Sequence, residues 1–209
     1  MKIIYDKIDK TLIPEMPKVV FEGRIVVVVS ADEARRAVDF LLTQPILGID
    51  TETRPSFKRG ITNNVSLLQV ATQDICFLFR LNHLGANEDI VRLLEDTTVP
   101  KIGLALRDDL ISLRKINPFT PGLFIDLQKH VSEIGVKDMG LQKLYANFFS
   151  MRISKNQRLT NWETDVLKEK QKMYAAIDAW VCIKLYEELT RLKATGDYTL
   201  VTAETEDEK

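Results

Sequence analysis

Leu47-Gly48-Ile49-Asp50-Thr51-Glu52-Thr53 is the stretch that decides the fold and the chemistry of this chain. It begins apolar and then places two acids, Asp50 and Glu52, two residues apart. Side chains at i and i+2 of a strand lie on the same face, so both acids would project together from an otherwise buried strand. Burying two like charges without partners is costly, and a divalent cation with oxygen ligands would compensate. An isolated pair of acids at this spacing more often marks a solvated strand end, so the rest of the chain has to decide.

The composition bounds the class of protein. The chain has 209 residues, of which 45% are hydrophobic, as expected for a globular domain with a substantial core. No apolar stretch is long enough to cross a bilayer, and residues 1–6 lack the features of a signal peptide, so we expect no membrane association. Cys76 and Cys182 stand among apolar residues without C-x-x-C spacing, which predicts core thiols in a reducing compartment and a cytoplasmic protein.

Patterns around the Asp50 strand predict the first half of a sheet. The β-branched run Arg24–Val29 is typical of a buried strand, and Ser30–Glu33 fits a capping box that opens a helix. Strands at 65–71 and 75–79 would continue the Asp50 strand as an antiparallel meander.

The second half of the chain alternates short strands with helices. Strands are expected near Ile102 and at 124–127, and helices at 89–94, from Asp108, at 141–148 and at 167–193. Together with the meander, this order predicts an α/β fold in which a mixed β-sheet, antiparallel and parallel in parts, is flanked by helices.

The domain organisation follows from these elements. We expect one domain at 24–195, preceded by an extended lead-in at 1–23. Residues 196–209 should form a disordered acidic tail. The net charge is -1, and without its acidic tail the body is slightly positive, which is compatible with a polyanionic partner.

Residues 101–113 supply another carboxylate. A short strand with Gly103 leads into a helix that begins with the pair Asp108 and Asp109. Aspartate is favoured at a helix N-cap, so one of the pair can take that position while the other faces the sheet.

Residues 173–180 supply the last carboxylate, that of Asp178. Tyr174 and Asp178 are four residues apart on a predicted helix and share a face, and small alanines between them would allow close packing. Alone, such a pair is more often a surface hydrogen bond than a catalytic arrangement.

Together these three stretches resemble the DEDDy branch of the DnaQ-like exonucleases, a family with a ribonuclease-H-like fold. The resemblance runs from about Gly48 to Leu189, and residues 141–174 are similar to the approach to the third motif in Werner-type and ribonuclease-D-type exonucleases. The second motif, with Gly103 six residues before an Asp, is more similar to the Werner type than to ribonuclease D, and this resemblance implies that the second-motif acid is Asp109. Met173 stands where the related DEDDh branch has histidine, and Tyr174 indicates the y branch.

The resemblance implies a 3′→5′ exonuclease that acts on DNA or RNA with a free 3′ end and releases nucleoside 5′-monophosphates. Asp50, Glu52, Asp109 and Asp178 would bind two divalent ions, Mg²⁺ or Mn²⁺, which prefer such oxygen ligands. Tyr174 would orient the attacking water. Targeting could depend on a protein partner, since no further nucleic-acid-binding segment is evident in the sequence.

Substrate contacts are expected near these acids. The candidates are Thr51, Lys155, Arg158 and Trp162, and the resemblance implies a phosphate contact for Lys155. A second basic patch comprises Arg54, Lys58 and Arg59. Solvated loop cations and a core tryptophan are the ordinary alternatives.

Two other functions are compatible with the fold. One is a catalytically inactive nucleic-acid-binding or scaffold module, and the presence of all four acids with Tyr174 argues against it. The other is a ribonuclease-H-like endonuclease, which the Tyr174–Asp178 spacing disfavours.

Overall fold

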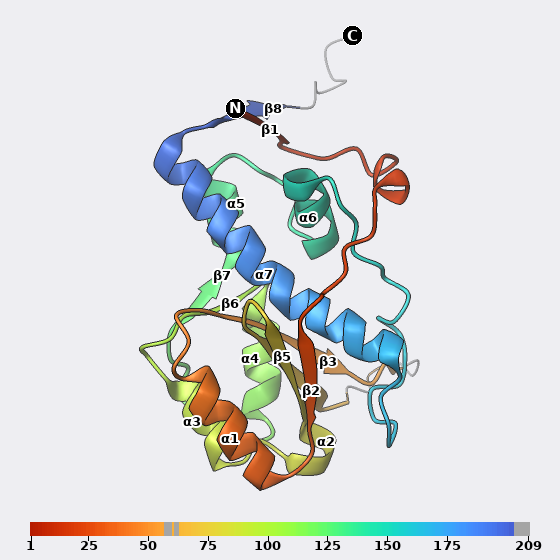
Figure 1. Ribbon diagram of the computed structural model, residues 1–209, viewed down its shortest axis with the longest axis vertical. Helices are drawn as coiled ribbons and strands as arrows, with labels where there is room; N and C mark the ends of the chain where they lie inside the picture. Colours follow the sequence, from red (N-terminus) through yellow and green to blue (C-terminus); the bar gives the residue numbers. More distant parts are fainter. Residues whose placement is uncertain (57–59, 61–62, 203–209) are drawn as a thin grey trace.

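A six-stranded mixed sheet forms the centre of the computed structural model, which describes residues 1–56, 60 and 63–202 (Figure 1). The strands lie in the order β2-β5-β4-β3-β6-β7. Their bounds are Arg24–Val28 (β2), Leu47–Thr53 (β3), Val65–Ala71 (β4), Ile75–Arg80 (β5), Lys101–Gly103 (β6) and Phe124–Asp126 (β7). Strands β3, β4 and β5 pair antiparallel, whereas β2, β6 and β7 join their neighbours in parallel. The predicted meander and mixed sheet are confirmed.

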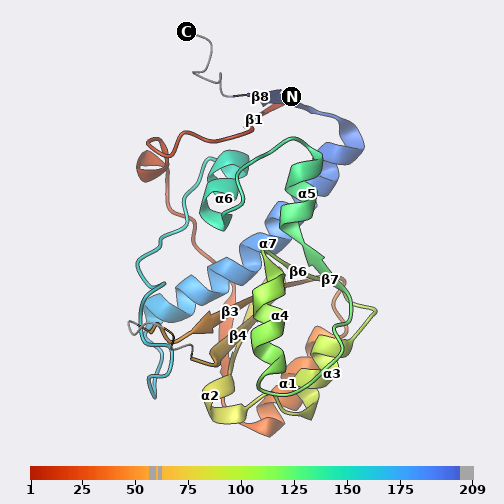
Figure 2. The same cartoon turned by 180° about the vertical axis from the view of Figure 1, so that it is seen from behind.

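Helices cover both faces of this sheet (Figures 1 and 2). On one face, the long helix α7 crosses the sheet, with α5 and α6 beside it; their bounds are Leu127–Glu133 (α5), Leu141–Phe149 (α6) and Glu169–Thr195 (α7). The other face carries Ala31–Leu41 (α1), Leu81–Leu84 (α2), Glu88–Glu95 (α3) and Leu106–Arg114 (α4). No helix in the described part of the chain is both long and apolar enough to span a membrane.

Strand β4 shows how the two layers are built. All of its residues are buried because helices lie above and below it. Leu67 and Ala71 belong to the apolar cluster on the α7 side, whereas Leu68 and Val70 belong to the cluster on the α1 side. A near-continuous apolar strand is therefore explained by burial of both faces.

Helix α1 begins at the predicted capping box. The Ser30 hydroxyl accepts a hydrogen bond from the Glu33 backbone N–H at 3.3 Å, and the Glu33 carboxylate accepts one from the Ser30 N–H at 3.1 Å. Both bonds satisfy backbone donors that a helix start leaves without partners.

A very close approach between β3 and α7 determines where the acids meet. A Cβ atom built on Gly48 would lie 2.0 Å from the backbone oxygen of Ala179, so no larger residue fits at Gly48 without moving the helix. Ala175, Ala176 and Ala179 are fully buried on α7 and keep the helix near the sheet. The small residues at both positions thus bring the third-motif helix onto the Asp50 strand.

The chain ends differ from the sequence prediction. Lys2–Tyr5 (β1) and Tyr198–Val201 (β8) form a two-stranded parallel sheet, and a short 3-10 helix, Ile13–Glu15 (η1), lies between β1 and β2. Residues 1–23 are therefore not wholly extended, and the predicted tail contains a strand at its beginning; residues 203–209 lie outside the described residues. Ile4 of β1 is fully buried, which gives the pairing an apolar anchor.

Candidate active site

Three carboxylates converge where β3 meets α7. One carboxylate oxygen of each of Asp50, Glu52 and Asp178 lies within 4.8 Å of the others. Asp50 and Glu52 alternate with Thr51 on β3 and so face α7, where Asp178 is 7% exposed and Glu52 is 9% exposed. No lysine or arginine among the described residues forms an ion pair with any of the three. The cluster has the donor set that a hard divalent cation requires.

The electrostatics of this cluster favour uptake of positive charge. Burial, followed by the charges of Asp178 and Asp109, raises the pKa of Asp50 well above its usual range. Burial and the nearby Asp178 raise the pKa of Glu52 to about 8, while the charge of Arg158 acts in the opposite direction. Burial also raises the pKa of Asp178, and its hydrogen bond with Tyr174 opposes that change. These acids cannot all ionise cheaply without cations beside them.

The metal-free protein should therefore become less stable as the pH rises. The pKa of Glu52 is about 8 in the folded chain and 4.5 ordinarily, so between these values the folded state holds a proton that the unfolded state lacks. Stability then falls with rising pH through this window. Thermal unfolding of EDTA-treated protein between about pH 5 and pH 9 would measure the slope, and Glu52→Gln should flatten it. Equal slopes in both proteins would contradict the burial of this charge.

Tyr174 stands one helical turn before Asp178 and forms a side-chain hydrogen bond with it. Burial, with the charges of Asp178 and Glu52, raises the pKa of Tyr174 above its usual value. The hydroxyl therefore keeps its proton near neutrality and acts as a hydrogen-bond donor rather than as a base.

Asp109 lies beside the cluster but is not one of the three clustered acids. It is in the first turn of α4, where its carboxylate accepts a hydrogen bond from the Thr51 hydroxyl of β3. Burial raises the pKa of Asp109, and its charge acts on both Asp50 and Glu52. Of the predicted pair, Asp109 meets the strand, whereas Asp108 is exposed.

The start of α4 corrects one prediction from the sequence. The N-cap position is Ala105, in a left-handed conformation with φ 57° and ψ 39°, so neither Asp108 nor Asp109 caps the helix. Asp126, at the end of β7, caps the start of α4 instead. Its carboxylate accepts hydrogen bonds from the N–H groups of Ala105 and Leu106, both at 3.0 Å, and from Gln128 at 2.9 Å. A single acid thus fixes the starts of α4 and α5, and with α4 the position of Asp109.

Asp126→Ala should lower the free energy of unfolding by roughly 2–4 kcal/mol, because hydrogen bonds to a charged group contribute about 1.5–3 kcal/mol each and do not add fully. Urea unfolding would measure the loss. Asp126→Asn keeps one acceptor oxygen and should cost less. Wild-type stability in the alanine variant would show that Asp126 does not hold these helices.

Two cavities flank the carboxylates. The first, of about 530 Å³, is lined by Glu52 and Asp109 together with Arg54 and Lys115. The second, of about 440 Å³, is lined by Lys143, Lys155, Tyr174 and Asp178. Arg158 lines both cavities. The acids therefore sit between two basic spaces, each within the size range of small-ligand pockets.

The predicted substrate contacts fall into different environments. Lys155 and Arg158 line the cavities, and Thr51 contacts Asp109. Trp162 is fully buried with its ring centroid 6.0 Å from that of Tyr174, an environment that matches the alternative of a core tryptophan better than an exposed substrate contact. Its ring supports Tyr174 from the core instead. Lys58 and Arg59 of the second basic patch lie outside the described residues.

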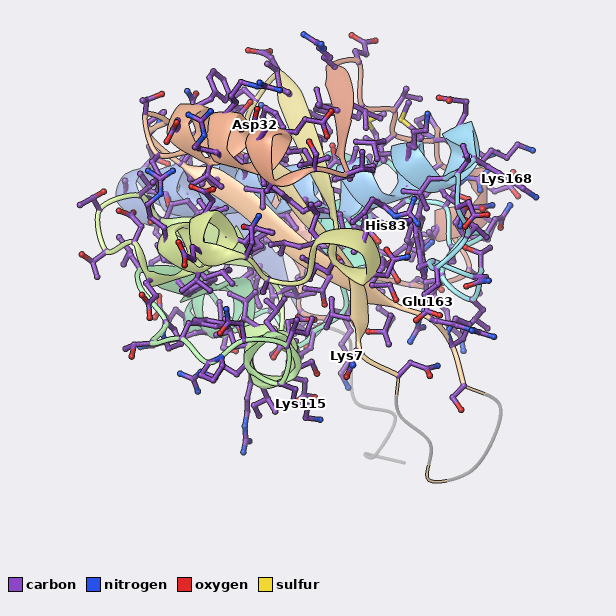
Figure 3. All side chains as sticks on the ribbon, turned by 90° about the horizontal axis from the view of Figure 1, so that it is seen from below. Lys7, Asp32, His83, Lys115, Glu163 and Lys168 are labelled. Carbon is purple, nitrogen blue, oxygen red and sulfur yellow. The ribbon has the colours of Figure 1, made fainter. Side chains whose placement is uncertain are left out.

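The loop before α7 is held by residues that the sequence did not single out. The guanidinium of Arg80, 1% exposed at the end of β5, donates hydrogen bonds to the backbone oxygens of Thr164 and Asp165. Glu163 of the same loop, labelled in Figure 3, pairs with Arg54 at 3.1 Å. An arginine at a strand end carries no sequence signal for this role. The Arg80 hydrogen bonds and the Arg54–Glu163 ion pair together hold in place the loop that carries Arg158.

Residues 25–193 match the protein family described as 3'-5' exonuclease, a span that includes the four acids and Tyr174. The chain belongs to the 3'-5' exonuclease family. The resemblance seen in the sequence is therefore confirmed, and Werner-type and ribonuclease D proteins are among the relatives of this exonuclease domain.

Two relatives illustrate how much of the exonuclease domain is shared. Exonuclease 3'-5' domain-containing protein 2 of Drosophila melanogaster is 34% identical over 153 residues, which cover 71% of this chain and 26% of that protein. A 3'-5' exonuclease of Arabidopsis thaliana is 30% identical over 156 residues, which cover 70% of this chain and 53% of that protein. The chain thus spans about half the length of these relatives, or less.

A solved structure shares the fold of this exonuclease domain. The Nibbler EXO domain of Aedes aegypti aligns with a TM-score of 0.76 at 20% identity, covering 86% of this chain and 94% of that one. This likeness confirms the predicted fold class of a mixed sheet flanked by helices.

Proposed function

We propose that this chain is a DEDDy-type 3′→5′ exonuclease that hydrolyses the terminal phosphodiester bond of DNA or RNA and releases nucleoside 5′-monophosphates. The observation that carries the proposal is the convergence of Asp50, Glu52 and Asp178 at a site without a paired cation among the described residues. Membership of the 3'-5' exonuclease family supports the same activity.

Four acids would hold two divalent ions, Mg²⁺ or Mn²⁺. Asp50, Glu52 and Asp178 are already clustered, and Asp109 approaches from α4 beside Thr51. Bound cations would supply activation of a water molecule and stabilisation of the negative charge on the phosphate and the departing 3′ oxygen. The residues fit these cations because every proposed ligand is a carboxylate, which is the donor that Mg²⁺ and Mn²⁺ prefer. Burial disfavours the charged form of Asp50 and Glu52, and a bound cation would offset that cost.

Tyr174 would orient the attacking water. Its hydroxyl already bonds to Asp178, and the raised pKa keeps its proton in place. With its proton donated to Asp178, the hydroxyl oxygen would accept a hydrogen bond from the water and hold it in line with the scissile bond, which is an effect of geometry rather than of proton transfer.

Arg158 and Lys155 would contact the phosphates of the strand. Arg158 lines both cavities, so its guanidinium lies where a strand crossing the acids would pass. Arginine binds phosphate in a bidentate manner, whereas a lysine acts as a point charge. Contacts of this kind bind the backbone without reading sequence.

Linear and circular substrates test the proposal directly. A 5′-labelled single strand of DNA or RNA should shorten progressively from its 3′ end with Mg²⁺ or Mn²⁺, and EDTA should stop the reaction. A circular single strand should stay intact because it has no end. Cleavage of the circle would indicate an endonuclease, and binding without any digestion would indicate the inactive module.

A further inference from the structure

Gln69 occupies an unusual position beside the acids. It lies on β4 directly opposite Asp50 in the antiparallel β3–β4 pair. Directly opposed residues place their side chains on the same face, with Cβ atoms about 4.5–5.5 Å apart. Gln69 therefore shares the α7-facing side of the sheet with Asp50.

The carboxamide of Gln69 has no partner within the described residues. The side chain is 0% exposed, and neither its amide nitrogen nor its amide oxygen forms a hydrogen bond. Its neighbours along the strand and across β5 are apolar, namely Leu67, Ala71 and Leu78. A buried amide without partners is unfavourable, and an apolar residue of the same size would pack here at lower cost.

Asp50 is the polar side chain that the strand register places opposite Gln69. Its carboxylate receives a backbone hydrogen bond from Thr51, and no side-chain donor reaches it among the residues that the structure describes. An unpaired amide and a carboxylate without a side-chain donor thus lie opposite each other on the α7-facing side of the sheet.

We propose that Gln69 is a positioning residue for Asp50, and that its amide N–H donates a hydrogen bond to the Asp50 carboxylate in the metal-loaded site. This inference rests on the proposed function. A neutral donor suits the position because it fixes the carboxylate without cancelling the negative charge that attracts the cations. Outer partners of metal ligands typically change metal affinity by about 10–100-fold.

Gln69→Met tests the proposal, because methionine keeps the length of the side chain and removes both polar atoms. Isothermal titration with Mn²⁺ alone should show affinity weaker by about 10–100-fold than in the wild type. The thermal midpoint without metal should stay equal or rise, since an unpaired amide has been removed. A merely structural role would instead lower that midpoint.

Leu78→Met is the matched control. Leu78 is fully buried and lies opposite Gln69 on the side away from Asp50, so this change alters the packing around the amide but removes no donor. Its Mn²⁺ affinity should equal that of the wild type.

Each outcome is decisive. Unchanged Mn²⁺ affinity in Gln69→Met overturns the proposal while leaving the exonuclease assignment intact. A methionine variant that does not fold overturns it as well, because the amide would then have structural partners. A wild-type protein that binds no Mn²⁺ defeats the proposed function itself, and the role of Gln69 with it.

Discussion

Asp178→Asn should abolish metal-dependent digestion and at the same time raise the thermal stability of the metal-free protein. Asp178 is 7% exposed and clusters with Asp50 and Glu52, so the asparagine removes one of three acids that repel one another when they ionise. The loss of activity should exceed about 100-fold, since even an outer partner of a metal ligand contributes about 10–100-fold to affinity or activity. Relief of about 1 kcal/mol of repulsion would raise the thermal midpoint by about 2–4 °C.

Steady-state digestion of a labelled strand and thermal unfolding in EDTA measure the two effects on one preparation. Asp108→Asn is the matched control, because Asp108 is also an aspartate near the site but is exposed on α4. It should keep both the activity and the stability of the wild type. An active Asp178→Asn enzyme would remove Asp178 from the metal site.

Tyr174→Phe should slow hydrolysis by about 10²-fold, the loss expected when a reacting group is held about 1 Å out of place. The hydroxyl is the only part removed, so the ring still packs beside Trp162. Mn²⁺ affinity should change little, because the four carboxylates stay in place. The effect should therefore appear in kcat, with KM nearly constant.

Tyr145→Phe provides the comparison for this second variant. Tyr145 is likewise buried, but its ring stacks on Phe149 in α6 rather than beside the acids. Removal of the Tyr145 hydroxyl should leave kcat unchanged. Equal rates for Tyr174→Phe and the wild type would reject the water-orienting role.

The sheet and the main helices were predictable because their signals are local. The Ser30–Glu33 box, the β-branched run before it and the alternation around Asp50 each fix an element from neighbouring residues. Placing the acids together needed the resemblance between three distant motifs, since no local pattern joins β3 to α7.

Other features of the site depend on contacts that no short stretch reveals. Asp126 caps α4 from the end of β7, although Asp108 and Asp109 are the acids closest to that helix start in sequence. Trp162 follows a basic loop and is nevertheless fully buried against Tyr174. In both cases the tertiary arrangement, rather than the local residue pattern, determines the role of the side chain.

Strand β1 has a consequence for how the molecule is made. Its strand partner in the described structure is β8, which is synthesised only after the whole of α7. On the ribosome, β1 emerges before the strands of the central sheet and must wait for β8 while that sheet assembles, because closing so long a loop is entropically slow. Docking of β1 should be a late event in biosynthesis, after the nuclease core has collapsed around α7.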